Sequence, residues 1–390
     1  MKRLKICLLL HFYQPWWQFP WVLKQIVNEC YRPILKLIEE FDCRHTTTAR
    51  LAHGCFCFTI NINLVLLEHL EKDYPDVVEG FKKAIQSGKL ELLGSTAQHP
   101  IMPLVPEFVQ GNQITEDSDK KESCFGIKHN CQGFFLPEMA FSTNLIQLLK
   151  SYDYEWTVID DEPFVATYGK NSVPFNSIIN HDGFNVFMRS NHWSNIISSG
   201  KFSFADIKAM MEFEIPNWTG NVPAYLILAM DAETFGHHHK HLIDTFLRPM
   251  LKEWAGHKIV PIESLGAYFP EREVHYLPDG SWSTSINNIE RNNPYPLWSS
   301  RMSIDRYRLW RLVNQALNHF EHAREDCLKM TSSCHWWQIS RAGWEPEFMQ
   351  KGAELAMNVI KEYGSADEIA FVQKDYDELM QLKKVFAHND

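Results

Sequence analysis

The chain has 390 residues, of which 45% are hydrophobic and 22% are charged. These values are ordinary for a globular protein, and the length suffices for a barrel-sized core with a smaller second unit. The formal net charge is −10 and Lys and Arg do not cluster, which argues against nucleic acid as a partner. No run approaches the roughly 20 apolar residues of a membrane span, so we expect no membrane contact.

The nine cysteines are odd in number and form no paired CxxC motif. We therefore expect reduced thiols and a cytoplasmic protein. The apolar stretch after Met1-Lys2-Arg3 is short and lacks a small-residue cleavage site, which favours a buried first strand over a signal peptide. The oligomeric state stays open.

Short apolar runs alternate with longer amphipathic stretches over the first two-thirds of the chain, the pattern of β-α units and a parallel sheet. The expected strands are Lys5–Leu10, Cys55–Ile60, Leu90–Leu93, Gly133–Leu136, Trp156–Ile159, Phe184–Met188, Tyr225–Met230 and Lys258–Val260. The expected helices are Val22–Glu40, Leu64–Lys72, Asp76–Ser87, Thr143–Tyr152, Phe204–Phe213 and His241–Trp254. Seven or eight strands suit a barrel better than an open sheet.

The character of the chain changes from about Pro270. A loop-rich segment with several Trp residues precedes three helical patterns, Asp305–Met330, Glu345–Tyr363 and Ala366–Phe386. We therefore expect a catalytic barrel over residues 1–272 and a C-terminal helical domain over residues 273–390. The helical domain is expected to pack on the barrel and to contribute to the cleft.

Two apolar runs end abruptly in a carboxylate. Glu138 follows Gly133–Leu136 after one proline, and Asp231 follows Tyr225–Met230 directly. The carboxyl ends of parallel strands form the face of an α/β barrel that carries chemistry. We therefore expect the two carboxylates to share one acid–base task, of the kind that glycoside hydrolysis requires. Asp231 is preferred over Glu233 because it directly follows its strand.

Other polar residues follow expected strands in the same way. His11 and Gln14 follow the first strand, and His99 follows Leu90–Leu93. These residue types suit the recognition of sugar hydroxyls, although each alone is equally typical of a strand-to-loop junction. Asp160-Asp161-Glu162 follows Trp156–Ile159 and either orients substrate or caps the next helix.

His237-His238-His239 and His241 form the densest histidine cluster. Asp231 with two of them would mimic the metal ligands of a polysaccharide deacetylase. Consecutive histidines at a helix start point about 100° apart, so at most two can share a metal. We therefore favour a polar rim from which His237 reaches the site, and we expect neither a metal nor a cofactor.

Four motifs in order resemble the first four conserved regions of family 57 of the glycoside hydrolases. They are His11 with Gln14-Pro15, residues 88–94 with His99-Pro100, residues 133–140, and residues 230–237. Each is weak alone, but the ordered set is specific and covers roughly residues 1–300. The resemblance implies a distorted seven-stranded (β/α) barrel with a C-terminal helical region, which acts on α-glucans with retention and without a cofactor.

By the same resemblance, Glu138 is the nucleophile and Asp231 is the general acid/base. His11 and His99 contact the sugar at the cleaved subsite, and Glu91 supports its strand. Trp-rich segments that cover the cleft correspond best to Ser281-Trp282-Ser283 and to residues 332–337. The full set of expected substrate contacts is His11, Tyr13, Gln14, His99, Arg189, Glu233, His237, Trp282 and Trp336.

The chain departs from the family pattern at three positions. Tyr13 stands where members commonly carry a second histidine, and Ser190 and Asn195 stand where acids are expected. The catalytic pair is kept. We therefore expect an α-amylase-like hydrolase of α-1,4-glucosidic bonds in an α-glucan or maltooligosaccharide. The alternatives are a 4-α-glucanotransferase or branching enzyme, a metal-dependent polysaccharide deacetylase, and an inactive carbohydrate-binding relative.

Overall fold

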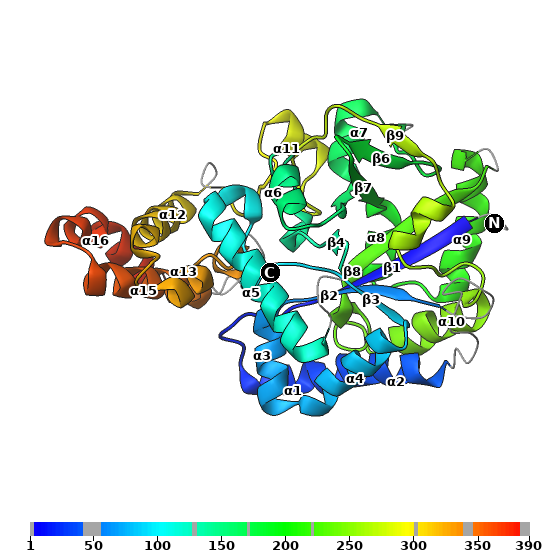
Figure 1. The fold of residues 1–390 in the computed structure, drawn as a ribbon, viewed down its shortest axis with the longest axis horizontal. Helices are drawn as coiled ribbons and strands as arrows, with labels where there is room; N and C mark the ends of the chain where they lie inside the picture. Colours follow the sequence, from blue (N-terminus) through cyan, green and yellow to red (C-terminus); the bar gives the residue numbers. More distant parts are fainter. Residues whose placement is uncertain are drawn as a thin grey trace, which may run out of the picture.

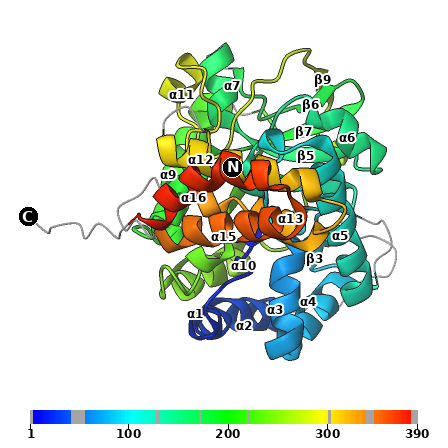
Figure 2. The same cartoon turned by 90° about the vertical axis from the view of Figure 1, so that its left-hand side faces the viewer.

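The computed structural model describes residues 4–41, 56–126, 131–169, 172–219, 222–299, 303–337 and 346–382. A barrel of parallel strands surrounded by helices forms the larger part (Figure 1). Helices α12 (Ile304–Ala316), α13 (Arg324–Met330), α15 (Pro346–Tyr363) and α16 (Ala366–Met380) lie together on one side of it. In Figure 2 these helices cover the part of the molecule nearest the viewer.

Seven parallel strands form the barrel, in the order β3-β2-β1-β8-β7-β5-β4. They are β1 (Leu4–Phe12), β2 (Phe58–Ile62), β3 (Leu90–Leu92), β4 (Gly133–Phe134), β5 (Trp156–Asp160), β7 (Phe184–Arg189) and β8 (Ala224–Asp231). Two hydrogen bonds around Gly94 join β3 to β4 and close the ring: Gly94 N donates to Gly133 O at 2.9 Å, and Phe135 N donates to Gly94 O at 2.8 Å. The predicted seven-stranded barrel is confirmed.

A glycine is required where the ring closes. A Cβ atom on Gly94 would lie 2.3 Å from the ring of Tyr154. No side chain can be accommodated there unless Tyr154 moves, so the close approach of β3 and β4 depends on this glycine.

The barrel helices include most of those predicted. They are α1 (Pro20–Ile26), α2 (Arg32–Glu40), α3 (Leu64–Asp73), α4 (Pro75–Gln86), α5 (Glu107–Phe125), α6 (Leu145–Ser151), α7 (Asp161–Tyr168), α8 (Asn191–Ser198), α9 (Phe204–Thr219) and α10 (Arg248–Trp254). The predicted helix Val22–Glu40 is α1 and α2 joined by a π-helical turn at Val27–Tyr31. Helices α5, α7 and α8 were not predicted. None of the described helices combines the length and the apolar character needed to cross a bilayer.

Two predicted elements differ from the structure. Lys258–Val260 is not a strand: only Ile259 pairs, by a single bridge to Ile6. Val260 and Ile262 instead enter the apolar core inside the barrel. The predicted helix Asp305–Met330 is two helices, α12 and α13. Parts of three further predictions, namely Cys55, Glu345 and residues 383–386, lie outside the described residues.

Two further strands were missed. Strand β6 (Ile178–His181) runs antiparallel to β7, and β9 (Glu271–Glu273) pairs with β6 outside the ring. The connecting residues Asp182 and Gly183 have φ angles of 50° and 76°. This Asp-Gly pair is typical of the two-residue turn that joins hairpin strands.

Side chains alternate along each strand between the barrel interior and the helices. The interior core takes alternate residues, namely Cys7, Leu9, Trp156, Val158, Phe187, Tyr225, Ile227 and Ala229. The residues between them on β1 and β8, such as Leu8 and Leu228, pack outward against the helices. This alternation decides which residues face inward at the carboxyl ends of the strands.

Candidate active site

A polar layer lies above the apolar interior of the barrel. On each strand it is formed by the next inward position after the core residues: His11 on β1, Asp160 on β5, Arg189 on β7 and Asp231 on β8. Asn61 on β2 belongs to the same layer, because it is the register partner of His11. Five strands therefore bring polar side chains to one end of the barrel, where α/β barrels carry their chemistry.

Asp231 and His11 are direct neighbours in this layer. They are register partners on β8 and β1, so their side chains project from the same face. His11 is buried, its Nδ1 atom lies 2.8 Å from Asn61 Oδ1, and its ring stacks on Phe135. Burial lowers the pKa of His11, while the charge of Asp231 acts in the opposite direction. His11 is therefore a neutral group held beside an acid.

Glu138 follows β4 in the short 3-10 turn Pro137–Met139. Its φ of 58° and the φ of 49° at Met139 lie in the left-handed region, which non-glycine residues seldom adopt. Trp282 donates its indole N–H to Glu138 Oε2 at 2.7 Å. The same indole meets His11 edge-on, with 5.9 Å between the ring centroids. Trp282 therefore contacts both Glu138 and His11, and His11 is the neighbour of Asp231.

His99 also has a left-handed backbone, with φ of 59°. Its Nε2 atom lies 3.1 Å from His11 Nε2, and the Tyr13 ring stacks on the His99 ring at 3.9 Å between centroids. The Tyr13 hydroxyl forms a hydrogen bond with Ser332 Oγ at 2.9 Å. Burial lowers the pKa of His99 well below its ordinary value. The structure therefore gathers three of the predicted contact residues in one stack.

Glu233 lies in a buried polar cluster with Gln14 and Tyr31. Its Oε1 atom accepts hydrogen bonds from Gln14 Nε2 at 2.9 Å and from the Tyr31 hydroxyl at 2.5 Å. Burial, followed by repulsion from Asp231, raises the pKa of Glu233 to about 7. Gln14 and Glu233, both predicted contacts, hold each other in this arrangement.

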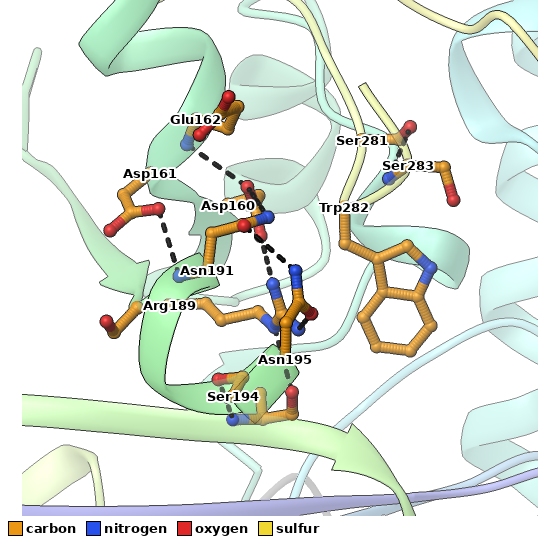
Figure 3. A network of polar contacts seen from close by, with 12 residues as sticks. Asp160, Asp161, Glu162, Arg189, Asn191, Ser194, Asn195, Ser281, Trp282 and Ser283 are labelled. Atoms are coloured by element: carbon orange, nitrogen blue, oxygen red, sulfur yellow. Dashed lines mark hydrogen bonds and ion pairs between the residues drawn. The ribbon is translucent and has the colours of Figure 1, made fainter. Parts of the chain in front are cut away.

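Three hydrogen bonds fix the position of the Arg189 side chain (Figure 3). Its guanidinium donates to Asp160 Oδ2 at 2.5 Å, to Asn195 Oδ1 at 2.8 Å and to Ala229 O at 2.8 Å. It also lies 5.8 Å from the Trp282 ring, close enough for a cation–π contact. Asn195, which replaces an expected acid, therefore still accepts a hydrogen bond from Arg189.

The acidic run after β5 caps a helix. Asp160 Oδ1 accepts the backbone N–H of Glu162 at the start of α7, and it also accepts the side-chain amide of Asn191. Asp161 Oδ1 accepts the backbone N–H of Asn191, and burial raises the pKa of Asp161 to about 8. The sequence left open whether these acids orient substrate or cap the next helix, and the observed contacts are those of a helix cap.

The histidine cluster divides among separate partners. His237 pairs with Glu29 at 2.8 Å, whereas His239 and His241 each lie 3.0 Å from a backbone carbonyl, of Ser198 and Gly200. Within the described ranges, His, Cys, Asp and Glu side chains do not group in threes that could hold a metal. The structure does not bring His237 to the stack around His11.

Trp336 also lies away from this stack. Its side chain is fully buried and stacks on Trp310 of α12, with 4.1 Å between centroids. It is part of the apolar core of the helical region. The ring packs within the helical core and not against Tyr13, His99 or His11, so we leave Trp336 out of the substrate contacts that we propose below.

Glu91 lies on β3 as the register partner of Thr59, one inward position before Asn61 of the polar layer. Its two carboxylate oxygens accept the backbone N–H groups of Ile262 and Glu263, each at 3.0 Å. Burial raises the pKa of Glu91 to about 7. These contacts hold the residues just after Lys258–Val260, the segment that was predicted as a last strand.

Two members of the site were not predicted. Asn61 contacts His11, and Ser333 Oγ lies 2.8 Å from His99 Nδ1. Asn61 is a strand-end polar residue of the kind used to find His11, but the expected strand stopped at Ile60. Ser333 lies in a segment singled out for its Trp residues, and no local pattern distinguishes its hydroxyl from that of Ser332.

Comparison with known proteins identifies the family. The sequence profile of glycosyl hydrolase family 57 matches residues 7–278. The chain therefore belongs to this family.

Two curated relatives match a shorter part of the chain. An α-amylase of Pyrococcus abyssi is 26% identical over 166 residues, which are 43% of this chain and 23% of the amylase. A 4-α-glucanotransferase of Thermococcus litoralis is 23% identical over 166 residues, with the same coverage of 43% and 23%. The matched segment thus spans about a quarter of the length of these relatives.

Solved structures share the fold. The Thermococcus litoralis 4-α-glucanotransferase superposes with a TM-score of 0.73 at 17% identity, over 93% of this chain and 60% of that enzyme. A family 57 branching enzyme of Thermococcus kodakaraensis gives a TM-score of 0.69 at 14% identity, over 100% and 97% of the two chains. The α-amylase AmyC of Thermotoga maritima gives 0.65 at 16%, over 97% and 98%.

Proposed function

We propose that this protein is a retaining glycoside hydrolase of the α-amylase type, which cleaves α-1,4-glucosidic bonds in an α-glucan or maltooligosaccharide. The observation that carries the proposal is the placement of Glu138 and Asp231 at one end of the barrel. Trp282 contacts Glu138 and His11, and His11 is the register partner of Asp231. The α-amylases and α-glucan transferases among the relatives and the solved structures support the choice of substrate.

The reaction requires two displacements at the anomeric carbon. Asp231, protonated at the start, donates its proton to the leaving glycosidic oxygen while a carboxylate oxygen of Glu138 attacks the anomeric carbon. The C–O bond to the leaving group breaks, and a glycosyl ester on Glu138 forms. Asp231 then removes a proton from water, whose oxygen displaces Glu138 and restores the original anomeric configuration.

The surrounding residues divide the remaining tasks. Trp282 binds Oε2 of Glu138 and so directs the other oxygen at the substrate. We propose His11, Tyr13 and His99 as the walls of the cleaved subsite, with Gln14, Glu233 and Arg189 holding their neighbours in place. His237 remains a proposed contact only for a longer substrate, because in the structure it pairs with Glu29.

We further propose that residues 1–272 are the catalytic barrel and residues 273–390 a helical domain packed on it. The division is supported by the separate apolar core that α12, α13, α15 and α16 share. The packing is supported by Ile101 and Val105 of the loop after β3, because both residues belong to the same core. A cytoplasmic location likewise stays a proposal. It is supported by the free thiols of Cys7, Cys30, Cys124, Cys131, Cys327 and Cys334.

The decisive experiment is product analysis on maltooligosaccharides with wild type, Glu138→Gln and Asp231→Asn. The amide oxygen introduced by Glu138→Gln still accepts from Trp282, so the fold is preserved while the nucleophile is lost. Glu162→Gln, which alters an acid in the first turn of α7, is the matched control. We expect both site variants to lose at least about 10³-fold in kcat, the control to stay within about twofold, and NMR to show the first-formed anomer with retained configuration.

Each other result has a definite meaning. Unchanged activity in both site variants would reject the catalytic pair, and an inverted product would overturn the assigned roles. Transfer products in place of reducing sugars would identify a glucanotransferase or branching enzyme with the same pair. Loss of activity in EDTA with recovery in Zn²⁺ would favour the deacetylase, which we do not expect.

A further inference from the structure

Residues 331–335 of the helical region reach into the barrel site. Ser332 Oγ binds the Tyr13 hydroxyl at 2.9 Å, and Thr331 Oγ1 accepts from Gln113 of α5 at 3.1 Å. Ser333 contacts His99 twice: its backbone N–H donates to His99 O at 2.9 Å, and its hydroxyl lies 2.8 Å from His99 Nδ1. The side chains of Ser332 and Ser333 are fully buried. This segment therefore forms part of the wall behind the stacked Tyr13 and His99.

The Ser333 hydroxyl ends a chain of four polar groups. Ser333 Oγ lies 2.8 Å from His99 Nδ1, His99 Nε2 lies 3.1 Å from His11 Nε2, and His11 Nδ1 lies 2.8 Å from Asn61 Oδ1. All four ring nitrogens are thus engaged inside the protein. Burial lowers the pKa of both histidines, so each ring carries a single proton.

The orientation of the Asn61 amide then decides where the protons lie, because the reverse orientation would reverse the whole chain. In the structure Asn61 Oδ1 faces His11 Nδ1 and can only accept, so His11 carries its proton on Nδ1 and presents a lone pair at Nε2. His99 must therefore donate from Nε2, which leaves a lone pair on its own Nδ1. Only the Ser333 hydroxyl can supply the hydrogen for that last contact. The chain runs in one direction, from Ser333 through His99 and His11 to Asn61.

We propose that Ser333 is a positioning residue that sets the tautomers of His99 and His11, and that the helical region completes the active site through it. Without the hydroxyl, His99 Nδ1 would be a buried lone pair with no donor, and a proton moved there would leave two Nε2 lone pairs facing each other. Either outcome disturbs the neutral His11 beside Asp231. The kinetic consequence rests on the proposed function; the tautomers themselves do not.

The primary test is long-range ¹H–¹⁵N NMR of the histidine rings in the resting full-length protein, which needs no substrate. We expect His99 to be protonated on Nε2 and His11 on Nδ1. Ser333→Ala should mix the tautomers of His99, whereas Ser333→Thr, which keeps a hydroxyl, should preserve them. Wild-type His99 protonated on Nδ1, or wild-type tautomers retained in Ser333→Ala, would overturn the proposal.

Kinetics provide the second readout. We expect Ser333→Ala to lower kcat by about tenfold with a smaller change in KM, and Ser333→Thr to recover most of it. Ser332→Ala, one residue away and bound to Tyr13, is the matched control and should leave the His99 tautomer unchanged. If Ser333→Ala does not fold, Ser333→Cys replaces it as a near-isosteric, weaker donor. Complete inactivity of the wild type on glucans would reject the proposed function and leave the NMR result intact.

Discussion

Trp282 holds Glu138 by two hydrogen bonds: the indole N–H donates to Oε2 at 2.7 Å, and the backbone N–H donates to the Glu138 carbonyl at 3.1 Å. One residue from beyond the barrel thus fixes both the carboxylate and the backbone of the proposed nucleophile. That backbone has a φ of 58°, a conformation that persists only when the surroundings impose it.

Replacing the indole should therefore weaken catalysis more than folding. We expect Trp282→Phe to lower kcat/KM by about 10- to 100-fold, the range for loss of a hydrogen bond to a charged group. Steady-state kinetics and a thermal melt measure the two effects separately. Trp254→Phe is the control, because its indole nitrogen is buried without an acceptor among the described residues. Equal losses of activity in the two variants would contradict the role of Trp282.

The buried pair of Arg189 and Asp160 should contribute to both stability and the site. Their side chains are 4% and 0% exposed, so removing one charge leaves the other uncompensated. We expect Arg189→Met to reduce the free energy of unfolding by about 3–5 kcal/mol. The double variant Arg189→Met/Asp160→Asn should recover part of this loss in urea denaturation. Additive losses would show that the two groups do not interact.

Glu233 should make stability depend on pH. Burial raises its pKa in the folded protein to about 7, above its ordinary value, so the folded state binds the proton more tightly than the unfolded state. The contribution of Glu233 to the free energy of unfolding is full at low pH. It is lost as the pH rises through about 7, by about 3 kcal/mol in total. Glu233→Gln should remove this dependence.

The measurement compares the free energies of unfolding at about pH 5 and about pH 8, on either side of the raised pKa. The free energy of unfolding of Glu233→Gln, relative to that of wild type, should be greater at about pH 8 than at about pH 5. The exposed Glu290→Gln, on the short helix Ile286–Glu290, provides the comparison and should follow wild type at both pH values. A constant difference between wild type and Glu233→Gln would show that Glu233 titrates alike in both states.

Closure of the barrel should be sensitive to one methyl group. A Cβ on residue 94 would meet the Tyr154 ring at 2.3 Å, so Gly94→Ala must displace that ring or separate β3 from β4. We expect a loss of about 1–3 kcal/mol in the free energy of unfolding. Gly266→Ala, where a Cβ meets nothing within 4 Å, should be nearly neutral. Chemical denaturation of both variants checks the prediction, and similar losses would contradict it.

The sequence predicted the barrel because its strands are buried on both faces, which produces short apolar runs that are easy to find. Helix α5 was missed for the opposite reason. Its buried face carries Gln113, Asp117 and Lys121, so it lacks the apolar period of an amphipathic helix. Asp117 binds Lys121 at 2.6 Å and accepts the backbone N–H groups of Leu64 and Ser95. Only the folded structure shows that these charges are satisfied internally.

The site was predictable to the extent that strand ends reveal it. His11 and Asp231 were found in this way and Arg189 through the family resemblance, and the structure places all three in the polar layer of the barrel. The contacts of Ser333 with His99 and of Trp282 with Glu138 could not be predicted, because these residues come from segments distant in sequence and their contacts depend on how those segments pack. The left-handed backbone at Glu138 and His99 likewise leaves no trace in residue types that are neither Gly nor Asn.

The junction of β3 with β4 has a further consequence for the chemistry. His99 leaves the first of these strands and Glu138 leaves the second, each a few residues past the two hydrogen bonds around Gly94. The contact that completes the ring therefore also sets the separation between His99 and Glu138, which we propose as a wall of the cleaved subsite and as the nucleophile. Loosening this contact would widen the gap between the two residues, so the precision of the proposed reaction depends on the integrity of the shortest strand pair of the ring.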